Sequence, residues 1–239
     1  MAALKPRDLV KPLDAAATPR PSARQRLIDA SEQLFAEHGW NAVSIRTIVA
    51  AAGVNLAALH YHFGSKEQLL TEIFAARAKP IAAERMRLLA EIERESGRPA
   101  LEKILEAFLR PALTIGSDAR FGGRAFVKLR ARLATEPESV SRRILASAFD
   151  ESSGAFLEAL GRALPEIPRA DLEWRFHFML GAMFYTMADA GRIQSLTGGR
   201  CDPGRVEDSL VHIIPFLAAG FRSAPGSVVP SVKSRRRSK

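Results

Sequence analysis

Residues 44–66 read SIRTIVAAAGVNLAALHYHFGSK, and this pattern predicts two short helices joined by a tight turn. Ser44 can cap the first helix, because a serine side chain accepts a hydrogen bond from the free backbone N–H groups at a helix start. The apolar residues that follow recur at helical spacing, and Gly53 supplies the left-handed backbone that ends the helix. Asn55 can cap a second helix over residues 56–61. Two short helices set at a sharp angle result.

Neighbouring helices are needed to complete this unit. The second helix is too short to persist alone, so Leu59 and Phe63 must be buried against other helices. Upstream, residues 22–25 predict a capping box that opens a longer helix, which Gly39 ends. Downstream, residues 65–68 predict another capping box, and the apolar positions after it predict the next helix. We therefore expect three helices around one small core, followed directly by a fourth.

Over residues 22–74 the chain resembles the tetracycline-repressor (TetR) family of bacterial regulators. The ordered match includes Phe-x-x-x-Gly at residues 35–39, Ala-Gly-Val at residues 52–54 and Leu-x-Tyr-His-Phe-x-x-Lys at residues 59–66. An ordered match of this length is more specific than a helix-turn-helix propensity alone. In such a three-helix unit the second helix of the pair enters the major groove of DNA.

The resemblance also implies which residues contact DNA. It places base contacts at Arg46 and at the outward residues of the second helix, Leu56, Ala57 and Ala58. It places phosphate contacts at Ser44, Tyr61, His62 and Lys66, and Asn55 belongs to the same expected set. His60 stands where the family usually has a tyrosine, so its contact is to phosphate, to a base, or absent.

The chemistry of two of these residues supports the same roles. Arg46 could form a bidentate pair with guanine, which contributes about 1–3 kcal/mol of discrimination between bases. The alternative for Arg46 is a surface arginine paired with a carboxylate. Lys66 lies in the first turn of its helix, where the helix dipole disfavours a cation, and a nearby phosphate would explain it. The alternative for Lys66 is an ordinary solvated lysine.

Composition limits the class of protein. The chain has 239 residues, of which 47% are hydrophobic, so it can bury a large core. Cys201 is its one cysteine, which excludes an internal disulfide framework and a multi-cysteine metal site and agrees with a reducing cytoplasm. Residues 1–21 hold no apolar run typical of a secretory signal, and no segment reaches the length of a membrane span. We expect a cytoplasmic protein with no cofactor, no metal and no membrane contact.

The formal net charge of +9 is concentrated at the two ends of the chain. Residues 1–26 carry a net +4 and residues 222–239 a net +6, so the remainder is close to neutral. The tail KSRRRSK at residues 233–239 either adds salt-sensitive attraction to DNA phosphates or only keeps the chain soluble. Arg20, Arg24 and Arg26 could reach the minor groove, as the arms of other helix-turn-helix proteins do.

The sequence predicts an all-α fold in two domains. We expect a disordered basic arm over residues 1–21 and a helix-turn-helix DNA-binding domain over residues 22–66. A larger helical domain for effector binding and dimerisation follows over residues 67–222, and a disordered basic tail over residues 223–239. From about residue 75 onward the apolar spacing is helical, with no alternating pattern that would predict a sheet.

The last two helices of this domain are apolar on more than one side. Asp202 and Pro203 are expected to cap and begin the final helix. A helix with two apolar faces is central or shared with a second subunit, and small residues allow close approach. We expect a homodimer contact over residues 170–193 and 203–221, the alternative being a core helix of a monomer. The candidate contact residues are Trp174, Gly181, Ala182, Tyr185, Leu210, Ile213 and Leu217.

The middle helices are the expected site of a small, apolar effector. In the family that the chain resembles, occupation of a pocket there moves the fourth helix and changes the spacing of the two DNA-reading helices. Candidate contacts with an acyl chain or an aromatic ligand are Phe108, Phe126, Phe149 and Phe178. Each of these phenylalanines is equally compatible with a packed core. His177 is expected to be a core or interface histidine.

The sequence does not predict an enzyme. It contains no Gly-rich phosphate loop, His-Glu-x-x-His, Gly-x-Ser-x-Gly or paired-cysteine motif. The predicted function is that of a transcriptional regulator, a repressor that binds an approximate inverted repeat in double-stranded DNA and is released by a small molecule. The alternative is a helical interaction or adaptor protein that keeps this scaffold without reading DNA sequence.

Overall fold

The computed structural model describes residues 21–115, 123–133, 138–188 and 191–224. All regular secondary structure in these ranges is helical, as the apolar spacing predicts. The helices are α1 (Ala23–His38), α2 (Ile45–Ala52), α3 (Leu56–Phe63), α4 (Lys66–Arg94), α5 (Leu101–Ile115), α6 (Gly123–Leu133), α7 (Glu138–Ala163), α8 (Arg169–Met187), α9 (Arg192–Thr197) and α10 (Val206–Arg222).

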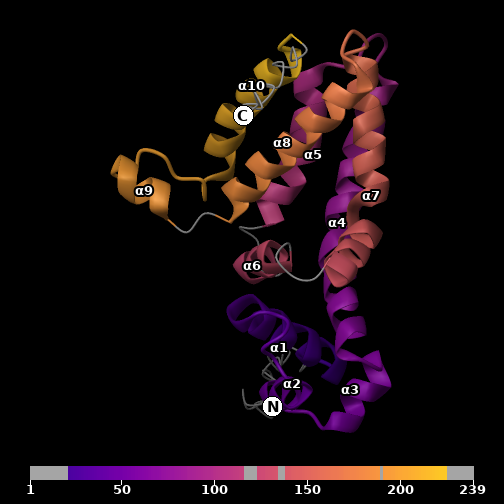
Figure 1. The fold of residues 1–239 in the computed structure, drawn as a ribbon, viewed down its shortest axis with the longest axis vertical. Coiled ribbons are helices and arrows are strands. Elements are labelled where there is room, and N and C mark those ends of the chain that lie inside the picture. Colours follow the sequence, from indigo (N-terminus) through magenta and orange to yellow (C-terminus); the bar gives the residue numbers. More distant parts are fainter. Residues whose placement is uncertain (1–20, 116–122, 134–137, 189–190, 225–239) are drawn as a thin grey trace, which may run out of the picture.

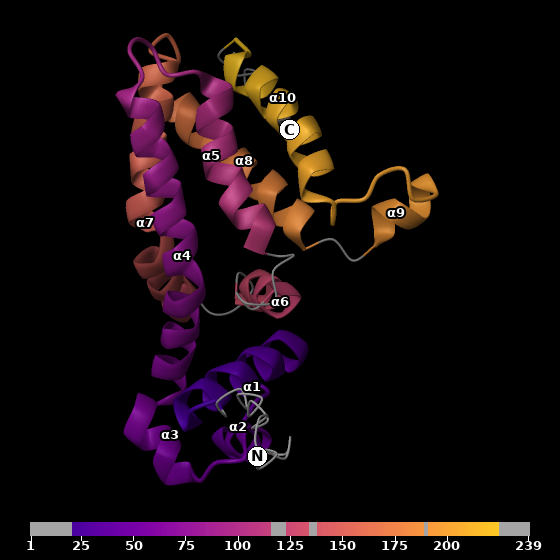
Figure 2. The ribbon, with the colours of Figure 1, turned by 180° about the vertical axis from the view of Figure 1, so that it is seen from behind.

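The helices form an elongated molecule with a small head and a larger helical body (Figure 1). The head consists of α1, α2 and α3, and α4 runs from it into the body, where it lies beside α7. Helices α5, α8 and α10 make up the rest of the body, and α5 packs against both α8 and α10. Seen from behind, α6 lies across the junction, between α1 and the body (Figure 2).

The four predicted N-caps of the first four helices are confirmed. Ser22, Ser44 and Ser65 each accept, through Oγ, from the backbone N–H three residues on, at 3.0 to 3.1 Å. Asn55 Oδ1 does the same for Ala58 at 2.8 Å. The head is closed by a shared apolar core, whose fully buried members include Leu27, Phe35, Ile48, Leu59, Leu69 and Ile73.

The two predicted capping boxes form only in part. The Gln25 side chain does not return to Ser22 but donates from Nε2 to Asp29 Oδ1 at 2.9 Å. The Ser65 backbone N–H donates to the Phe63 carbonyl at 2.7 Å. It is therefore not the donor to the Gln68 side chain that the second capping box requires. One half of each box is therefore present, and the reciprocal bond was wrongly predicted.

Helix α4 crosses the predicted domain boundary. Its first turns bury Leu70 and Phe74 in the core of the head, and its later turns bury Ile81 and Leu89 in the body. The boundary at residues 66 and 67 therefore falls at the start of a helix that belongs to both domains, and the domain limits stay predictions. The basic segments predicted at the two ends lie outside the described residues, except for Pro21, Ser223 and Ala224.

The region before the last helix differs from the prediction. Helix α10 begins at Val206, not at Pro203, and Arg205 occupies the N-cap position without a side-chain cap bond. Asp202 instead accepts from Gly204 N at 3.0 Å and from Gln194 Nε2, which forms a tight turn. The short helix α9 precedes this turn and was not predicted. None of the helices in the described ranges is long and apolar enough to cross a membrane.

Candidate nucleic-acid interface

Helix α3 is held by one face and exposed on the other. Leu59 and Phe63, one turn apart, are buried against α1, α2 and α4, as predicted from the length of the helix. The opposite face therefore points to solvent, and Ala57 is exposed there. Leu56 and His60 are also exposed, although the spacing of Leu56 puts it on the side of Leu59 and Phe63. Tyr61 is 86% exposed. A short helix with an exposed outer face on a rigid support is suited to lie in a DNA groove.

Not all expected contact residues lie on that outer face. Ala58 and His62 are half-buried, and the His62 ring packs at 6.1 Å from the Phe63 ring. Tyr61 lies edge-on to His62, with ring centroids 5.1 Å apart. His60 Nδ1 lies 3.0 Å from the Gly64 carbonyl, so its ring is tied to the end of its own helix. Ser44 and Asn55 already use a side-chain oxygen to cap a helix.

Arg46 is the most available cation of the helix-turn-helix unit. It lies in the first turn of α2 and is exposed. Within the described ranges it makes no ion pair, whereas the alternative for this residue required a carboxylate partner. By contrast, Arg24 pairs with Glu72 at 2.7 Å, and Arg26 donates to the Gly53 carbonyl at 3.3 Å. Arg20 lies outside the described residues.

Lys66 has partners inside the protein, which changes the explanation for it. Its Nζ donates to the carbonyls of Trp40 and Val43, both at 2.7 Å, and lies 4.3 Å from the centre of the Trp40 ring. These contacts tie α4 to the loop between α1 and α2. The helix dipole penalty is therefore offset within the fold, and a phosphate contact at Lys66 stays a prediction.

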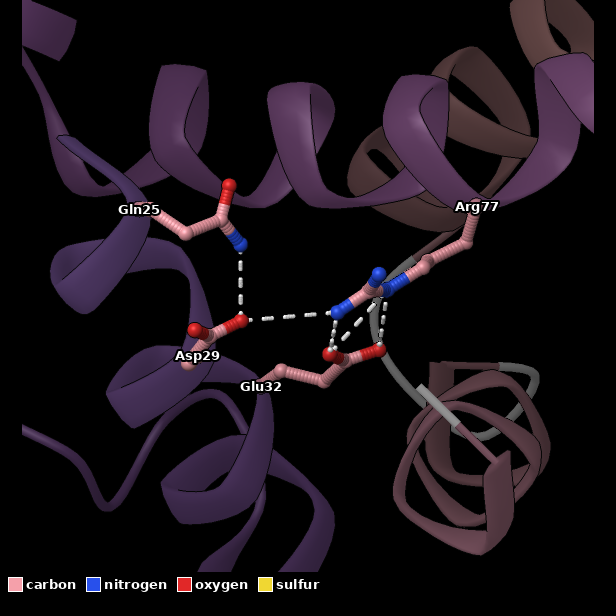
Figure 3. A network of polar contacts seen from close by, with 4 residues as sticks. All are labelled: Gln25, Asp29, Glu32 and Arg77. Carbon is pink, nitrogen blue, oxygen red and sulfur yellow. Dashed lines mark hydrogen bonds and ion pairs between the residues drawn. The ribbon is translucent and has the colours of Figure 1, made fainter. Parts of the chain in front are cut away.

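A buried ion pair joins the head to the body. Arg77 on α4 donates from Nη2 to Glu32 of α1 at 2.6 Å and from Nε to both Glu32 oxygens, while Asp29 lies 3.6 Å from the same guanidinium (Figure 3). Burial raises the pKa of Glu32, and the bonds and charge of Arg77 oppose that rise without cancelling it. The pair is therefore well formed but costly in desolvation. Sequence reasoning missed it, because its members lie 45 residues apart.

An open, polar cleft lies beside this ion pair. It has a volume of about 500 Å³ and is lined by residues of α1, α4 and α6. Glu37 of α1 and Lys128 of α6 face it, and the Arg132 guanidinium of α6 donates to the Glu37 carbonyl at 2.9 Å. The contact between α1 and α6 therefore borders a cleft that is open to solvent. It provides a second connection between head and body, in addition to α4.

Three of the four candidate effector residues are core residues. Phe108 packs edge-on against Phe156 and Phe176, with centroids 5.2 and 5.3 Å apart. Phe126 packs against Phe74 at 5.2 Å, and Phe149 is also buried. Phe178 does not belong with them, because it is 63% exposed on α8 and faces solvent.

The expected dimer residues fall into two groups. Trp174, Gly181 and Tyr185 of α8 are exposed, as a contact surface requires. Leu210 and Leu217 are buried within the protomer, so they cannot form the outer contact that was predicted for them. Ala182 and Ile213 are half-buried. His177 is exposed and packs against Trp174, so its expected core position was wrong and its interface position stays a prediction.

The exposed apolar surface of these two helices was only partly predicted. Phe178 stacks on Trp174, with centroids 5.9 Å apart, and Val211 and Phe216 of α10 are also exposed. We call the set Trp174, Phe178, Tyr185, Val211 and Phe216 the α8–α10 face. The signal that could have found Val211 and Phe216 is that neither lies on the helical stripe shared by Leu210 and Leu217.

Comparison with known proteins agrees with this geometry. The profile of bacterial regulatory proteins of the tetR family matches residues 27–73, and that of the tetracyclin repressor-like C-terminal domain matches residues 106–220. The chain belongs to the TetR family of transcriptional regulators. TetR-family membership places it among regulatory proteins and not among enzymes.

Curated TetR-family relatives match the chain over part of its length. The HTH-type transcriptional repressor AcnR of Corynebacterium glutamicum is 34% identical over 86 residues, which are 36% of this chain and 42% of AcnR. The HTH-type transcriptional dual regulator CecR of Shigella flexneri is 40% identical over 76 residues, or 29% of this chain and 34% of CecR. The matched part is therefore less than half of either relative.

Solved structures share the whole fold. PfmR, a TetR family regulator from Thermus thermophilus, superposes with a TM-score of 0.58 at 20% identity and covers 87% of this chain and 100% of its own. FadR from Bacillus subtilis, solved with stearoyl-CoA, gives 0.55 at 17% identity and covers 82% and 98%. At such identities the likeness concerns the fold alone.

Proposed function

We propose that this protein is a sequence-specific DNA-binding repressor, acting as a homodimer in the cytoplasm and released from DNA by a small molecule. The observation that carries the proposal is the combination of an anchored α3 with an exposed outer face and the exposed Arg46 beside it. An arginine that no described carboxylate engages is available to pair with guanine, the commonest specific contact in the major groove.

The α8–α10 face supports the homodimer. It gathers five large apolar side chains on two packed helices. Large exposed apolar side chains gathered on neighbouring helices are typical of an interaction site, and symmetric pairing of two helices per protomer gives a four-helix contact. Two heads would then meet successive major grooves about 34–36 Å apart, which predicts an approximate inverted repeat as the operator.

Two connections could carry an effector signal from the body to the head. Helix α4 enters both cores, and α6 packs on α1 across the polar cleft. A ligand that shifts α4 or α6 in the body would therefore turn the head and change the distance between the two recognition helices. We propose an effector with a substantial apolar part, in keeping with the stearoyl-CoA held by the FadR structure.

Selection from random double-stranded DNA, followed by fluorescence anisotropy with the selected site, tests the proposal. We expect an enriched inverted repeat, and we expect Arg46→Ala to bind it about 10- to 100-fold more weakly while retaining its affinity for unrelated DNA. Arg94→Ala, an exposed arginine near the end of α4, is the matched control and should bind as the unchanged protein does. No enrichment of any site, together with an unaltered Arg46→Ala variant, would favour the adaptor alternative.

A further inference from the structure

Two arginines are buried in the body of the protein, where apolar residues would be expected. Arg85 on α4 is 1% exposed and Arg130 on α6 is 5% exposed. Both occupy apolar stripes at helical spacing, since Ile81 and Leu89 flank Arg85, and Phe126 and Leu133 flank Arg130. This placement was the sequence signal that could have identified them. Arginine is rarely buried unless a partner neutralises it.

The partners of Arg85 are neutral. Its Nε donates to the Phe108 carbonyl at 2.8 Å, and Nη2 lies 3.5 Å from the sulfur of Met183. The guanidinium also lies 3.6 Å from the centre of the Phe108 ring. Among the described residues no carboxylate forms an ion pair with Arg85. Among the described residues, its charge is therefore stabilised by a carbonyl dipole, a sulfur atom and a ring face.

The guanidinium of Arg130 has fewer hydrogen-bond acceptors in the described structure than that of Arg85. Its guanidinium lies between the rings of Phe149 and Phe184, at 4.2 and 4.0 Å from their centres. Ring faces stabilise a cation, but they do not accept the N–H bonds that lie in the plane of the guanidinium. Accordingly, Nε and Nη1 of Arg130 are buried without a hydrogen-bond partner among the residues that the structure describes. Buried donors without acceptors are rare in folded proteins and call for a specific cause.

The two guanidinium groups belong to one region of the core. Met183 and Phe184, which contact Arg85 and Arg130 respectively, are consecutive residues of α8. Burial lowers the pKa of both arginines to about 9, and the charge of Arg130 contributes to the lowering at Arg85. Since both values lie above neutral pH, two like charges that repel each other remain in this part of the core at pH 7. In the described part of the chain no acidic residue pairs with either one.

We propose that the effector is an amphipathic anion, whose carboxylate or phosphate group binds Arg85 and Arg130. The inference rests on the proposed effector-responsive function and narrows the chemical class of the effector. An oxyanion would supply the acceptors that Nε and Nη1 of Arg130 lack and would offset the repulsion between the two cations. The apolar part of the molecule would lie among the rings of Phe108, Phe149 and Phe184.

The position of Arg130 connects this site to the head. Arg132, two residues further along α6, donates to the Glu37 carbonyl of α1. An anion that draws Arg130 towards Arg85 therefore acts on the helix that contacts the head. Binding at this site would favour one position of α6 relative to α1, which is the kind of two-state element that effector control requires.

Thermal unfolding of the full-length protein tests the proposal without DNA. The probes are octanoate, phenylacetate and octanoyl-coenzyme A, with 1-octanol as the neutral counterpart. We expect at least one anionic probe to raise the melting temperature by about 3 °C or more and 1-octanol to raise it less. Stabilisation by octanoate or phenylacetate assigns the anion to a carboxylate, and stabilisation by the thioester alone assigns it to phosphate.

Two variants separate the binding site from the fold. Arg130→Met should melt, without ligand, at the same temperature as the unchanged protein or higher, because an unpaired buried charge is removed. It should also lose about tenfold or more in affinity for the anionic probe. Lys128→Met removes an exposed cation from the same helix and should retain the affinity.

Three results would overturn the proposal. The first is a ligand-free Arg130→Met protein that melts several degrees lower, since Arg130 would then be structural. The second is equal stabilisation by 1-octanol and the anionic probes, or none by any of them. The third is an anionic probe that stabilises Arg130→Met fully. Failure of DNA selection with a normal anion response would instead refute only the DNA-reading function.

Discussion

At the scale of single residues, Lys66 shows how a functional pattern can have a structural cause. Its ammonium holds two backbone carbonyls and a tryptophan ring together, and so joins α4 to the loop after α1. Hydrogen bonds from a charged donor contribute about 1.5–3 kcal/mol each when their removal leaves a partner unsatisfied. The residue therefore helps to position the head on α4.

Replacing Lys66 by methionine should lower the free energy of unfolding by about 2 kcal/mol, because the Trp40 and Val43 carbonyls lose their donor. Urea denaturation followed by circular dichroism measures the change. Lys79→Met, an exposed lysine on the same helix, is the control and should stay within about 0.5 kcal/mol of the unchanged protein. Equal effects of the two substitutions would show that the Lys66 contacts contribute nothing.

Residue-scale features were predictable only when their partners were close in sequence. The caps at Ser22, Ser44, Asn55 and Ser65 depend on an amide three residues away, and the local pattern was sufficient. The partners of Lys66 lie 23 and 26 residues away, which no local pattern reports. Their distance in sequence explains why these contacts of Lys66 were not predicted, since helix propensity says nothing about tertiary contacts.

At the scale of helices, the Glu32–Arg77 pair fixes α1 on α4. Glu32 is buried, so removing its charge takes from the largely buried Arg77 guanidinium its nearest carboxylate and leaves the more distant Asp29 at 3.6 Å. A second pair joins the same helices at the surface, between Arg24 and Glu72. The two pairs differ in burial but connect the same elements, which makes them a natural comparison.

Glu32→Gln should lower the free energy of unfolding by about 3 kcal/mol, because breaking a buried pair strands its partner. Glu72→Gln should change it by less than about 1 kcal/mol, as is usual for exposed pairs. Chemical denaturation of both variants provides the comparison. If Glu72→Gln were as damaging as Glu32→Gln, burial would not be the cause.

Ion pairs between α5 and α10 should make stability depend on acid pH. Hydrogen bonds from Arg222 and from Arg110 hold the pKa values of Glu102 and Glu207, respectively, below the usual 4.5. Both carboxylates therefore stabilise the fold above pH 4.5, and this contribution is lost as the pH falls through their lowered values. The double variant Glu102→Gln/Glu207→Gln should show a flatter loss of melting temperature below pH 4.5. A curve parallel to that of the unchanged protein would contradict this.

Element boundaries were predicted well where apolar spacing was long and poorly where a turn intervened. The long helices follow from their stripes, and α4 was expected from its cap and its apolar face. Asp202 and Pro203 resemble a helix start, but the Asp202 side chain binds Gly204 and Gln194 instead. The Asp202 side chain could cap a helix or form a turn, and its contact with Gln194 of α9 favours the turn. Because α9 is too short to give a periodic signal, the sequence did not predict this contact.

At the scale of the whole molecule, the α8–α10 face is the surface that we propose as the contact between protomers. The sequence predicts a dimer contact on these two helices but names Leu210 and Leu217, which pack inward. Periodicity shows that a helix has two apolar faces, yet it does not say which face meets the protomer's own core. That choice depends on how α10 packs on α5 and α8, which is a tertiary property.

Phe178→Glu should weaken the homodimer by about 2–4 kcal/mol, since a charge would be placed among stacked aromatic rings in the contact. Sedimentation equilibrium measures the association, and DNA affinity should fall with it. Leu196→Glu is the control, because Leu196 is exposed on α9 and outside the α8–α10 face. An unchanged monomer–dimer equilibrium for Phe178→Glu would refute this interface.

The shared helix α4 has a consequence for how the protein unfolds as well as for how it works. Its first turns complete the core of the head and its later turns complete the core of the body. Because both cores pack on the same continuous helix, unfolding of one core should destabilise the other. Heating should therefore give a single calorimetric peak rather than two. The continuity of α4 through both cores would then explain both the proposed regulation by movement of α4 and the cooperative unfolding of the two domains.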